Sequence, residues 1–239
     1  GTSNSLASIH DGSTHLVPLE VDTPVMPTAT YLDQELHTRT GQDAIDRYIE
    51  DNTGRRVELV PEVVGQSALL VGDPGASSRS APETLAQNVY GPATEDLGLP
   101  GRLFRGLKRL LGDPGTRRLM VFGHPYRIVA LITPVLLRLR REIEAERVRL
   151  GLPEPVGALR VGHPVHFEGR DPHRNRTAFT RLEEACGYAG LKNVVFYPEP
   201  VAATLSWREA AGADYAGTAL TVDFGGGTLD LAVLEFRGA

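Results

Sequence analysis

The residues best suited to chemistry form a short segment near the end of the chain, in which Gly225, Gly226 and Gly227 lie between Asp223 and Asp230. Glycine leaves backbone N–H groups unshielded and permits backbone angles that other residues avoid, so such a turn can hold a phosphate on the main chain. The two carboxylates could then hold Mg²⁺, which usually contacts protein through one or two carboxylates together with the substrate's phosphates. An ordinary glycine-rich hairpin turn is the alternative.

A further candidate carboxylate, Glu199, lies in Tyr197-Pro198-Glu199-Pro200, where a strand pattern gives way to a helical one. Proline disfavours helical geometry in the residue before it and suits the first helical position, so we expect the helix to begin at Pro200. Glu199 would then lie at the carboxyl end of a strand, where open α/β sheets bind ligands. The alternative is an acid that only caps the helix.

The basic candidate is Lys108, because a chain with 25 basic residues contains only two lysines, Lys108 and Lys192. A compact, mobile ammonium can reach a phosphate or an attacking water where a rigid guanidinium does not fit. A solvated charge on a helix surface is the alternative. Lys192 is interpreted as a surface residue.

The elements that must position these residues follow from the spacing of apolar residues. Helices are predicted at residues 42–52, 128–143, 173–188 and 200–210, and strands at 5–10, 14–17, 158–165, 193–197, 218–223 and 229–236. Asp11-Gly12 favours a hairpin between the first two strands. The alternation indicates an α/β fold in which helices cover a mixed sheet.

Two segments are ambiguous. Pro134 falls inside the predicted helix at 128–143, where it either kinks the helix or, with Thr133 as the N-cap, marks the true start. Residues 73–100 are rich in Gly, Pro, Ser and Ala and show little periodicity. We therefore expect either a surface excursion or an irregular subdomain there, with few rigid core contacts.

Composition excludes several classes of function. With 239 residues, 41% of them hydrophobic, the chain can form one or two cores, and a net charge of −5 provides no basic surface for nucleic acid or an anionic membrane. The apolar run at 128–137 is too short to cross a bilayer. The single cysteine, Cys186, excludes a disulfide framework and favours a reducing, cytoplasmic setting. No P-loop or dinucleotide-binding motif is present.

Both ends of the chain read as interior sequence. Gly1-Thr2-Ser3-Asn4-Ser5 follows no methionine and reads like the inside of a loop, and the strand pattern at 229–236 stops directly before Arg237-Gly238-Ala239. We therefore expect a fragment of a longer protein.

Four segments match, in order, those of the seventy-kilodalton heat-shock chaperones, the DnaK-type family of the actin-like ATPases. They are Gly1-Thr2-Ser3-Asn4-Ser5, Lys108-Arg109-Leu110-Leu111-Gly112, Glu199-Pro200-Val201-Ala202-Ala203 and the segment from Asp223 to Asp230. They resemble the family's first phosphate loop, lysine segment, Glu-Pro-x-Ala-Ala signature and second phosphate loop. Residues 161–167 resemble the strand that carries the family's switch proline, here Pro164. The Gly-His-Pro variant there, and the loose match at 33–100, resemble the divergent bacterial YegD-like branch more than DnaK itself.

The resemblance implies an actin-like ATPase, or ribonuclease H-like, fold in which a mixed sheet is flanked by helices. Residues 1–27 and 124–212 would form lobe IA, with the ribonuclease H-like core, and residues 28–123 the inserted subdomain IB. Residues 213–239 would form the first hairpin of lobe II, most of which is absent from this chain.

The resemblance also implies a site for ATP or ADP with Mg²⁺, and with K⁺ as a second candidate ion. Hydrolysis of ATP needs mainly charge neutralisation and an aligned water. The residues expected to hold the β- and γ-phosphates are Gly1, Thr2, Ser3, Asn4, Gly225, Gly226 and Gly227.

The resemblance also implies roles for the remaining site residues. Lys108 would neutralise the γ-phosphate and orient the attacking water. Glu199 and Asp223 would hold the water shell of Mg²⁺, Thr228 would hydrogen-bond the γ-phosphate, and Asp230 would contact a monovalent cation. Glu199 and Pro164 would also relay the nucleotide state outward.

The implied function is therefore the ATP-hydrolysing nucleotide domain of a chaperone, inactive as an isolated fragment, with unfolded polypeptide or a co-chaperone bound through regions outside this chain. Two alternatives stay open: a metabolite kinase of the same superfamily, which needs a carboxylate base for a substrate hydroxyl, and a non-hydrolysing, nucleotide-gated scaffold or filament subunit. The structural prediction common to the site is that Lys108, Glu199 and Thr228 converge on one cleft.

Overall fold

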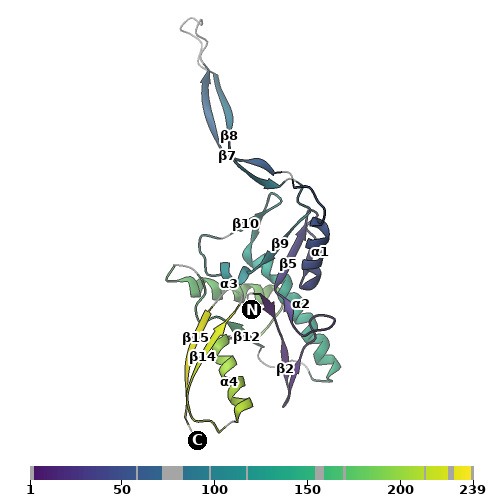
Figure 1. Ribbon diagram of the computed structural model, residues 1–239, viewed down its shortest axis with the longest axis vertical. Coiled ribbons are helices and arrows are strands. Elements are labelled where there is room, and N and C mark those ends of the chain that lie inside the picture. The colour runs from purple at the N-terminus through teal and green to yellow at the C-terminus, as the bar shows by residue number, and fades with distance from the viewer. Residues whose placement is uncertain are drawn as a thin grey trace, which may run out of the picture. The chain divides into compact units, whose positions relative to one another are not determined.

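A computed structural model describes residues 3–57, 59–71, 83–96, 98–116, 118–153, 159–168, 171–212, 214–225 and 229–237. The chain divides into two compact units, residues 1–50 with 101–239 and residues 51–100. Figure 1 shows both units and labels most of their longer elements. The second unit is shorter than the subdomain expected at 28–123, and those wider boundaries stay a prediction.

The first unit begins with short antiparallel pairs. Strand β1 (Asn4–Ser5) pairs with β4 (Met26–Pro27), and β2 (Ser8–His10) pairs with β3 (Thr14–Leu16). The β2–β3 hairpin turns at Asp11 and Gly12, so the hairpin predicted from the sequence is confirmed.

A three-stranded antiparallel sheet follows, in the order β6-β5-β9. Its strands are β5 (Ala29–Asp33), β6 (Thr38–Thr40) and β9 (Gly101–Arg105). Helix α1 (Gln42–Asn52) coincides with the predicted helix, and its Ala44 packs on Ala29 and Tyr31 of the central strand. The 3₁₀ helix η1 (Leu107–Leu110) and the hairpin of β10 (Arg118–Val121) and β11 (His124–Arg127) complete this region.

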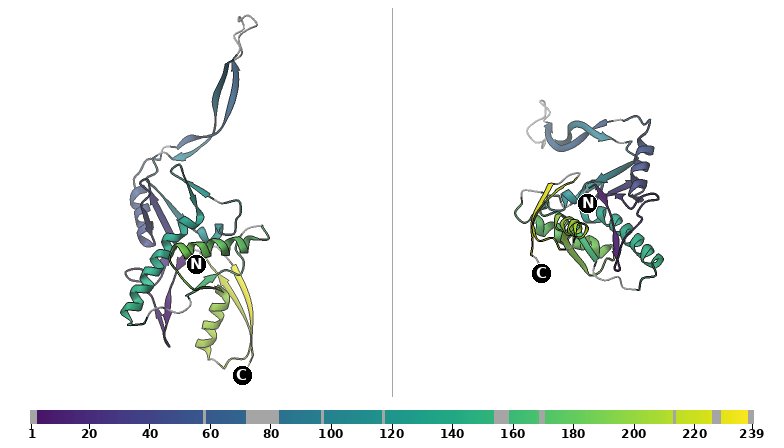
Figure 2. Two further views of the ribbon diagram at one scale, coloured as in Figure 1. Left: turned by 180° about the vertical axis from the view of Figure 1, so that it is seen from behind. Right: turned by 60° about the horizontal axis from the view of Figure 1, so that its bottom comes forward.

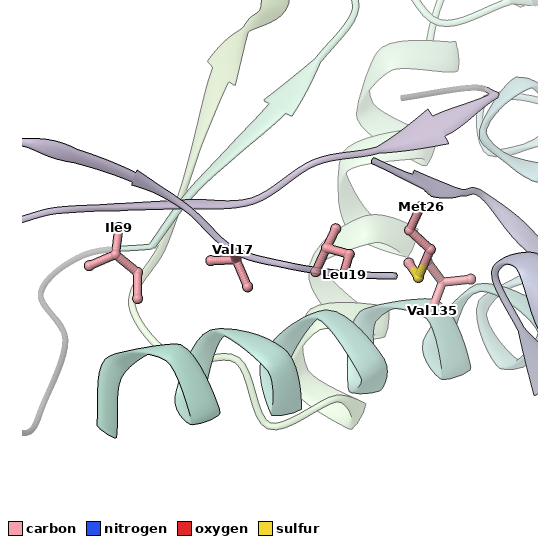
Figure 3. Packing of buried hydrophobic residues seen from close by; sticks show 5 residues of the cluster. All are labelled: Ile9, Val17, Leu19, Met26 and Val135. Carbon is pink, nitrogen blue, oxygen red and sulfur yellow. The ribbon is translucent and has the colours of Figure 1, made fainter. Parts of the chain in front are cut away.

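The longest described helix, α2 (Ile128–Arg149), carries much of the core. Figure 3 shows Ile9, Val17, Leu19 and Met26 on one side of this helix, beside Val135. All five side chains are at most 5% exposed. The apolar spacing that predicts a helix at 128–143 thus also marks the surface that is buried.

Helix α2 begins at Ile128 and contains Pro134, so the alternative start at Thr133 is wrong. The Thr133 hydroxyl does not cap a new helix, because it donates a hydrogen bond to the Val129 carbonyl at 2.8 Å. Proline lacks an N–H for the preceding turn, but packing of the apolar face outweighs the loss of one backbone hydrogen bond.

The second half of the first unit alternates between strands and helices. These are β12 (Leu159–His163), α3 (Arg174–Tyr188), β13 (Val194–Pro198) and α4 (Glu199–Ala211), close to the predicted ranges. Strands β12 and β13 run parallel. Helix α3 packs on α2 through a cluster that includes Val129, Leu136, Ala185 and Cys186.

The chain then forms an antiparallel hairpin of β14 (Gly217–Phe224) and β15 (Leu229–Phe236). Figure 2 shows α4 along this hairpin. The side chains of Leu220, Val222, Phe224, Leu229, Leu231 and Val233 are each between 56% and 84% exposed. They occupy alternate positions along each strand, so one face of the hairpin is apolar and open.

The described residues thus form a mixed α and β structure with four α-helices and sheets of two or three strands. The expected strands and helices occur, but their hydrogen-bonded ladders remain small and separate. The actin-like ATPase fold and its single mixed sheet stay a prediction.

The second unit contains one antiparallel ribbon, formed by β7 (Leu59–Val71) and β8 (Glu83–Asp96). The prediction of an irregular segment at 73–100 is therefore wrong for residues 83–96, while residues 72–82 lie outside the described part. Each strand of a hairpin obtains its hydrogen bonds from the other, and this pairing requires no apolar periodicity in the sequence. At the base of the ribbon, Arg55 forms a 2.5 Å ion pair with Asp96, which lowers the pKa of that carboxyl.

Among the described helices, none combines the length and the apolar character needed to span a bilayer.

Candidate functional site

The candidate site lies at the carboxyl end of the parallel strands β12 and β13. His163 lies opposite Pro198 in the register, so both strands end at the same level. Pro164 follows β12 directly, and Glu199 follows β13. Glu199 therefore occupies the position expected from the sequence, at a sheet edge of the kind where α/β proteins bind ligands.

Glu199 is also the first residue of α4, one residue before the predicted start at Pro200. The preceding residue, Pro198, is extended, with φ −61° and ψ 125°. A residue before proline disfavours the helical region without being excluded from it. A carboxylate in the first turn also interacts favourably with the helix dipole, which offsets this preference.

An ion pair joins Lys108 to Glu199 across 91 residues of sequence, with 2.5 Å between Lys108 Nζ and Glu199 Oε1. The two side chains are 14% and 26% exposed, respectively. Among the described residues, Glu199 is the only hydrogen-bond partner of this ammonium. An ammonium carries three N–H donors, so two stay available for a phosphate oxygen or a water.

The segment that carries Lys108 is held from both sides. Leu107 and Leu111 are buried. From helix α3, Arg181 Nη1 lies 3.2, 2.9 and 2.8 Å from the carbonyl oxygens of Leu110, Leu111 and Asp113, to which it donates. The backbone of η1 is thereby fixed, and with it the origin of the Lys108 side chain.

Gly162 provides the space next to the Glu199 carboxylate. A Cβ atom at residue 162 would lie 3.0 Å from Glu199 Cγ and 3.2 Å from Glu199 Oε1, closer than ordinary van der Waals contact. A side chain here would displace the carboxylate. The end of β12 and the position of Glu199 are therefore coupled sterically.

The two aspartates of the glycine-rich turn lie opposite each other, because Asp223 pairs with Asp230 in the β14–β15 register. Directly opposed residues project from the same face of an antiparallel ladder. Thr221, two residues before Asp223, shares this face, and its hydroxyl contacts the hydroxyl of Thr204 in α4. The aspartates thus project from the face that packs on the helix beginning with Glu199.

Asp230 reaches the end of β12 directly. Its Oδ1 accepts a hydrogen bond from the Val165 N–H at 2.9 Å. The Asp230 residue is 6% exposed, and its Oδ2 is buried and has no hydrogen-bond partner in the described part of the chain. Asp230 therefore adjoins the same strand end as Glu199 and retains one unused carboxylate oxygen.

The charges of this group fit a hard cation. Lys108 contributes one positive charge, and Glu199, Asp223 and Asp230 contribute three negative charges. Opposed like charges on a ladder are unfavourable, and the orphan oxygen of Asp230 lacks the partner that a buried carboxylate normally has. Carboxylate oxygens are the ligands preferred by Mg²⁺ and Ca²⁺. These three carboxylates could therefore hold a divalent cation.

Several expected site residues cannot be placed. Gly1, Thr2, Gly226, Gly227 and Thr228 lie outside the described residues. The convergence of Lys108 with Glu199 is observed, whereas the convergence of Thr228 on the same cleft stays a prediction.

The remaining residues of the two expected phosphate loops are described. Gly225 directly follows β14. Near the start of the chain, the Ser3 carbonyl accepts a hydrogen bond from Thr28 at 2.9 Å, and Asn4 pairs with Pro27. Among the described residues, Ser3 and Asn4 make no hydrogen bond to Lys108, Glu199 or the aspartates, so their phosphate contacts stay a prediction.

Two other features of the first unit, a group of possible metal ligands and a surface hollow, contain none of the predicted site residues. Asp33, Glu35 and His37 bring their ligand atoms within 4.8 Å of one another. Asp33 already accepts hydrogen bonds from the His37 N–H and interacts with its ring, which explains the cluster as a turn. A hollow of about 840 Å³ is lined by residues 38–43 and by the α2 segment 134–144.

No protein-family model matches the chain.

Proposed function

We propose that this chain is the Mg²⁺-dependent ATP-binding and ATP-hydrolysing part of a chaperone related to the seventy-kilodalton heat-shock proteins, closest to the YegD-like branch. The observation that carries the proposal is the contact between Lys108 and Glu199 at the carboxyl end of β12 and β13. Residues from widely separated segments meet there because of the fold, and the sequence resemblance assigns both to the same reaction.

The role of Lys108 follows from its unused donors. One N–H binds Glu199, and the other two can bind the γ-phosphate and the attacking water together. Positive charge next to the transferred phosphoryl group stabilises the transition state, and this term dominates phosphoryl transfer. The ion pair with Glu199 holds the ammonium in one orientation before the nucleotide arrives.

The carboxylates serve the metal. Glu199 and Asp223 would hold the water shell of Mg²⁺, and Asp230, with its orphan oxygen, would contact a second cation such as K⁺. When bound, Mg²⁺ neutralises charge on the β- and γ-phosphates. The phosphate loops, with Gly1, Thr2, Ser3 and Asn4 on one side and Gly225, Gly226, Gly227 and Thr228 on the other, would hold the phosphates.

Partners and location complete the proposal. Unfolded polypeptide or a co-chaperone would bind outside this chain, and the protein would act in the cytoplasm. The buried Cys186 is compatible with a reducing compartment, because burial raises the pKa of its thiol to about 11 and leaves it unreactive.

Substitution of Lys108 tests the proposal, with Lys192 as a matched control because it is the other lysine of the chain. In the full-length protein, we expect Lys108→Ala to reduce ATP turnover by about 100-fold or more, the usual cost of removing one transition-state donor. Calorimetric affinity for Mg-ADP should change only a few-fold, because the loops supply most of the binding. Lys192→Ala should leave both quantities unchanged.

Three outcomes would overturn the proposal or replace it. Unaltered turnover in Lys108→Ala would remove the site assignment. Transfer of the γ-phosphate to a small alcohol or acid would select the metabolite kinase. Nucleotide binding without turnover in the unmodified protein, together with nucleotide-dependent assembly, would select the scaffold.

A further inference from the structure

The turn after β12 is tied to the rest of the first unit from two sides. Helix α3 binds it on one side, because the Asn175 amide oxygen accepts the Phe167 N–H at 2.9 Å and Arg174 donates to the Phe167 carbonyl at 2.8 Å. On the other side, the β14–β15 hairpin binds it through the hydrogen bond that Asp230 accepts from the Val165 N–H.

The contact at Val165 fixes the end of β12 close to Glu199. Val165 lies three residues after Gly162, the residue that abuts Glu199. Pro164, between them, is buried, and its carbonyl accepts a hydrogen bond from the His163 ring at 2.7 Å. Only His163 and Pro164 separate Val165 from Gly162, and proline has a fixed φ, so a shift of Val165 can be transmitted to Gly162 against its pairing with β13 and can change the space left for the Glu199 carboxylate.

We propose that Asp230 is a positioning residue that sets the geometry of the Lys108–Glu199 pair through the Val165 N–H, in addition to any contact that it makes with a cation. The two carboxylate oxygens allow both roles, because Oδ1 holds the main chain and Oδ2 has no described partner. The inference rests on the proposed function for its effect on kcat, but the hydrogen bond from Val165 to Asp230 can be tested without nucleotide.

Substitution at Asp230 separates the positioning role from the role of charge. Asparagine has the same shape and keeps an oxygen that can accept the Val165 N–H, but it loses the negative charge. Alanine loses both. If positioning matters, Asp230→Ala loses about 10- to 100-fold in kcat at saturating Mg²⁺ and K⁺, as expected for a reacting group displaced by about 1 Å, and Asp230→Asn, which keeps the acceptor oxygen, loses at least about threefold less than Asp230→Ala. The loss of charge in Asp230→Asn appears in the metal concentration needed for half-maximal rate.

Amide hydrogen exchange of Val165 in nucleotide-free protein provides a readout that does not depend on activity. We expect its protection to survive in Asp230→Asn and to fall by roughly tenfold or more in Asp230→Ala, with amides in α2 unaffected. Exchange of α2 amides also shows whether Asp230→Ala remains folded.

The outcomes distinguish the two proposals. Equal losses of kcat in Asp230→Asn and Asp230→Ala, or an unchanged Val165 amide in Asp230→Ala, would refute the positioning role. If the unmodified protein shows no ATP turnover but the Val165 amide loses its protection in Asp230→Ala, the proposed function is refuted. The hydrogen bond from Val165 to Asp230 is then still supported as a structural contact.

Discussion

At the scale of single residues, the site depends on a glycine, Gly162, whose lack of a side chain leaves space for its neighbours. Gly162 leaves the room in which the Glu199 carboxylate meets Lys108, and its position on β12 is set by the parallel pairing with β13. Catalytic groups must be held to within a fraction of an ångström, so a small steric change next to Glu199 should affect turnover more than stability.

Gly162→Ala tests this steric coupling. The added Cβ, at 3.0 Å from Glu199 Cγ, should displace the carboxylate by a few tenths of an ångström and lower ATP turnover by about tenfold, with little change in thermal stability. Gly187→Ala in α3 is the matched control, because nothing lies within 4 Å of a Cβ there. It should keep full activity and stabilise the protein by about 0.5–1 kcal/mol. Equal activity of the two variants would show that Glu199 tolerates the contact.

The charged residues of the site could be predicted from the sequence, but their contacts could not. Lys108 and Glu199 could be named from their types and from the family resemblance, but not as neighbours by spacing alone, because 91 residues separate them. The hydrogen bond from the Val165 N–H to Asp230 could not be predicted at all, because every residue except proline has a main-chain N–H and the sequence does not show which one is bound. The role of Gly162 could not be found either, since it depends on the distance to Glu199, the first residue of helix α4.

At the scale of elements, helix α3 acts on the site through its contact with η1. Arg181 Nη1 donates to the carbonyl groups of Leu110, Leu111 and Asp113, so the helix helps to fix the turn that carries Lys108. Arginine suits this role because its guanidinium presents several rigid donors.

Replacing Arg181 by methionine removes these donors and keeps much of the apolar stem. We expect a loss of about 1–3 kcal/mol in the free energy of unfolding, since carbonyl groups are left unpaired, and a fall in kcat with little change in KM for ATP. Urea unfolding and steady-state kinetics measure the two effects. Arg176→Met, on the exposed side of the same helix, should change neither. A kcat equal to that of the unmodified protein would separate η1 from catalysis.

The elements themselves were predictable where local pattern decides them. The β2–β3 hairpin and helices α1, α3 and α4 follow from turn residues and apolar spacing, so their ranges agree with the sequence to within one or two residues at most boundaries. Strand β8 was missed because its residues are extended by pairing with β7, a non-local cause that leaves little periodicity. The start of α2 before Pro134 was ambiguous because tertiary packing overrides the local preference of proline.

At the scale of the whole molecule, α2 contributes side chains to several hydrophobic clusters of the first unit. It contributes Val135 to the cluster with β2 and β4, Val129 and Leu136 to the cluster with α3, and Leu131 to the cluster with Leu107 and Val121. The segment that carries Lys108 and the strands at the start of the chain therefore pack on the same helix, in two separate clusters.

Leu131→Ala should destabilise the first unit by about 2–5 kcal/mol, because the side chain is 1% exposed and its loss leaves a cavity. Leu137→Ala, on the same helix but 45% exposed, should change the free energy of unfolding by no more than about 0.5 kcal/mol. Chemical denaturation of both variants gives the comparison. Similar values for the two would mean that α2 does not organise the core in this way.

The burial of Cys186 against α2 has a practical consequence. The chain has a single thiol, it is 1% exposed, and its pKa is raised to about 11, so the reactive thiolate is scarce at neutral pH while the helices stay packed. A maleimide or iodoacetamide reagent can modify it only after α3 separates from α2. The rate at which Cys186 is alkylated therefore reports how often α2 and α3 separate. Comparing this rate with and without nucleotide would show whether nucleotide makes the separation rarer, and the measurement needs no engineered label.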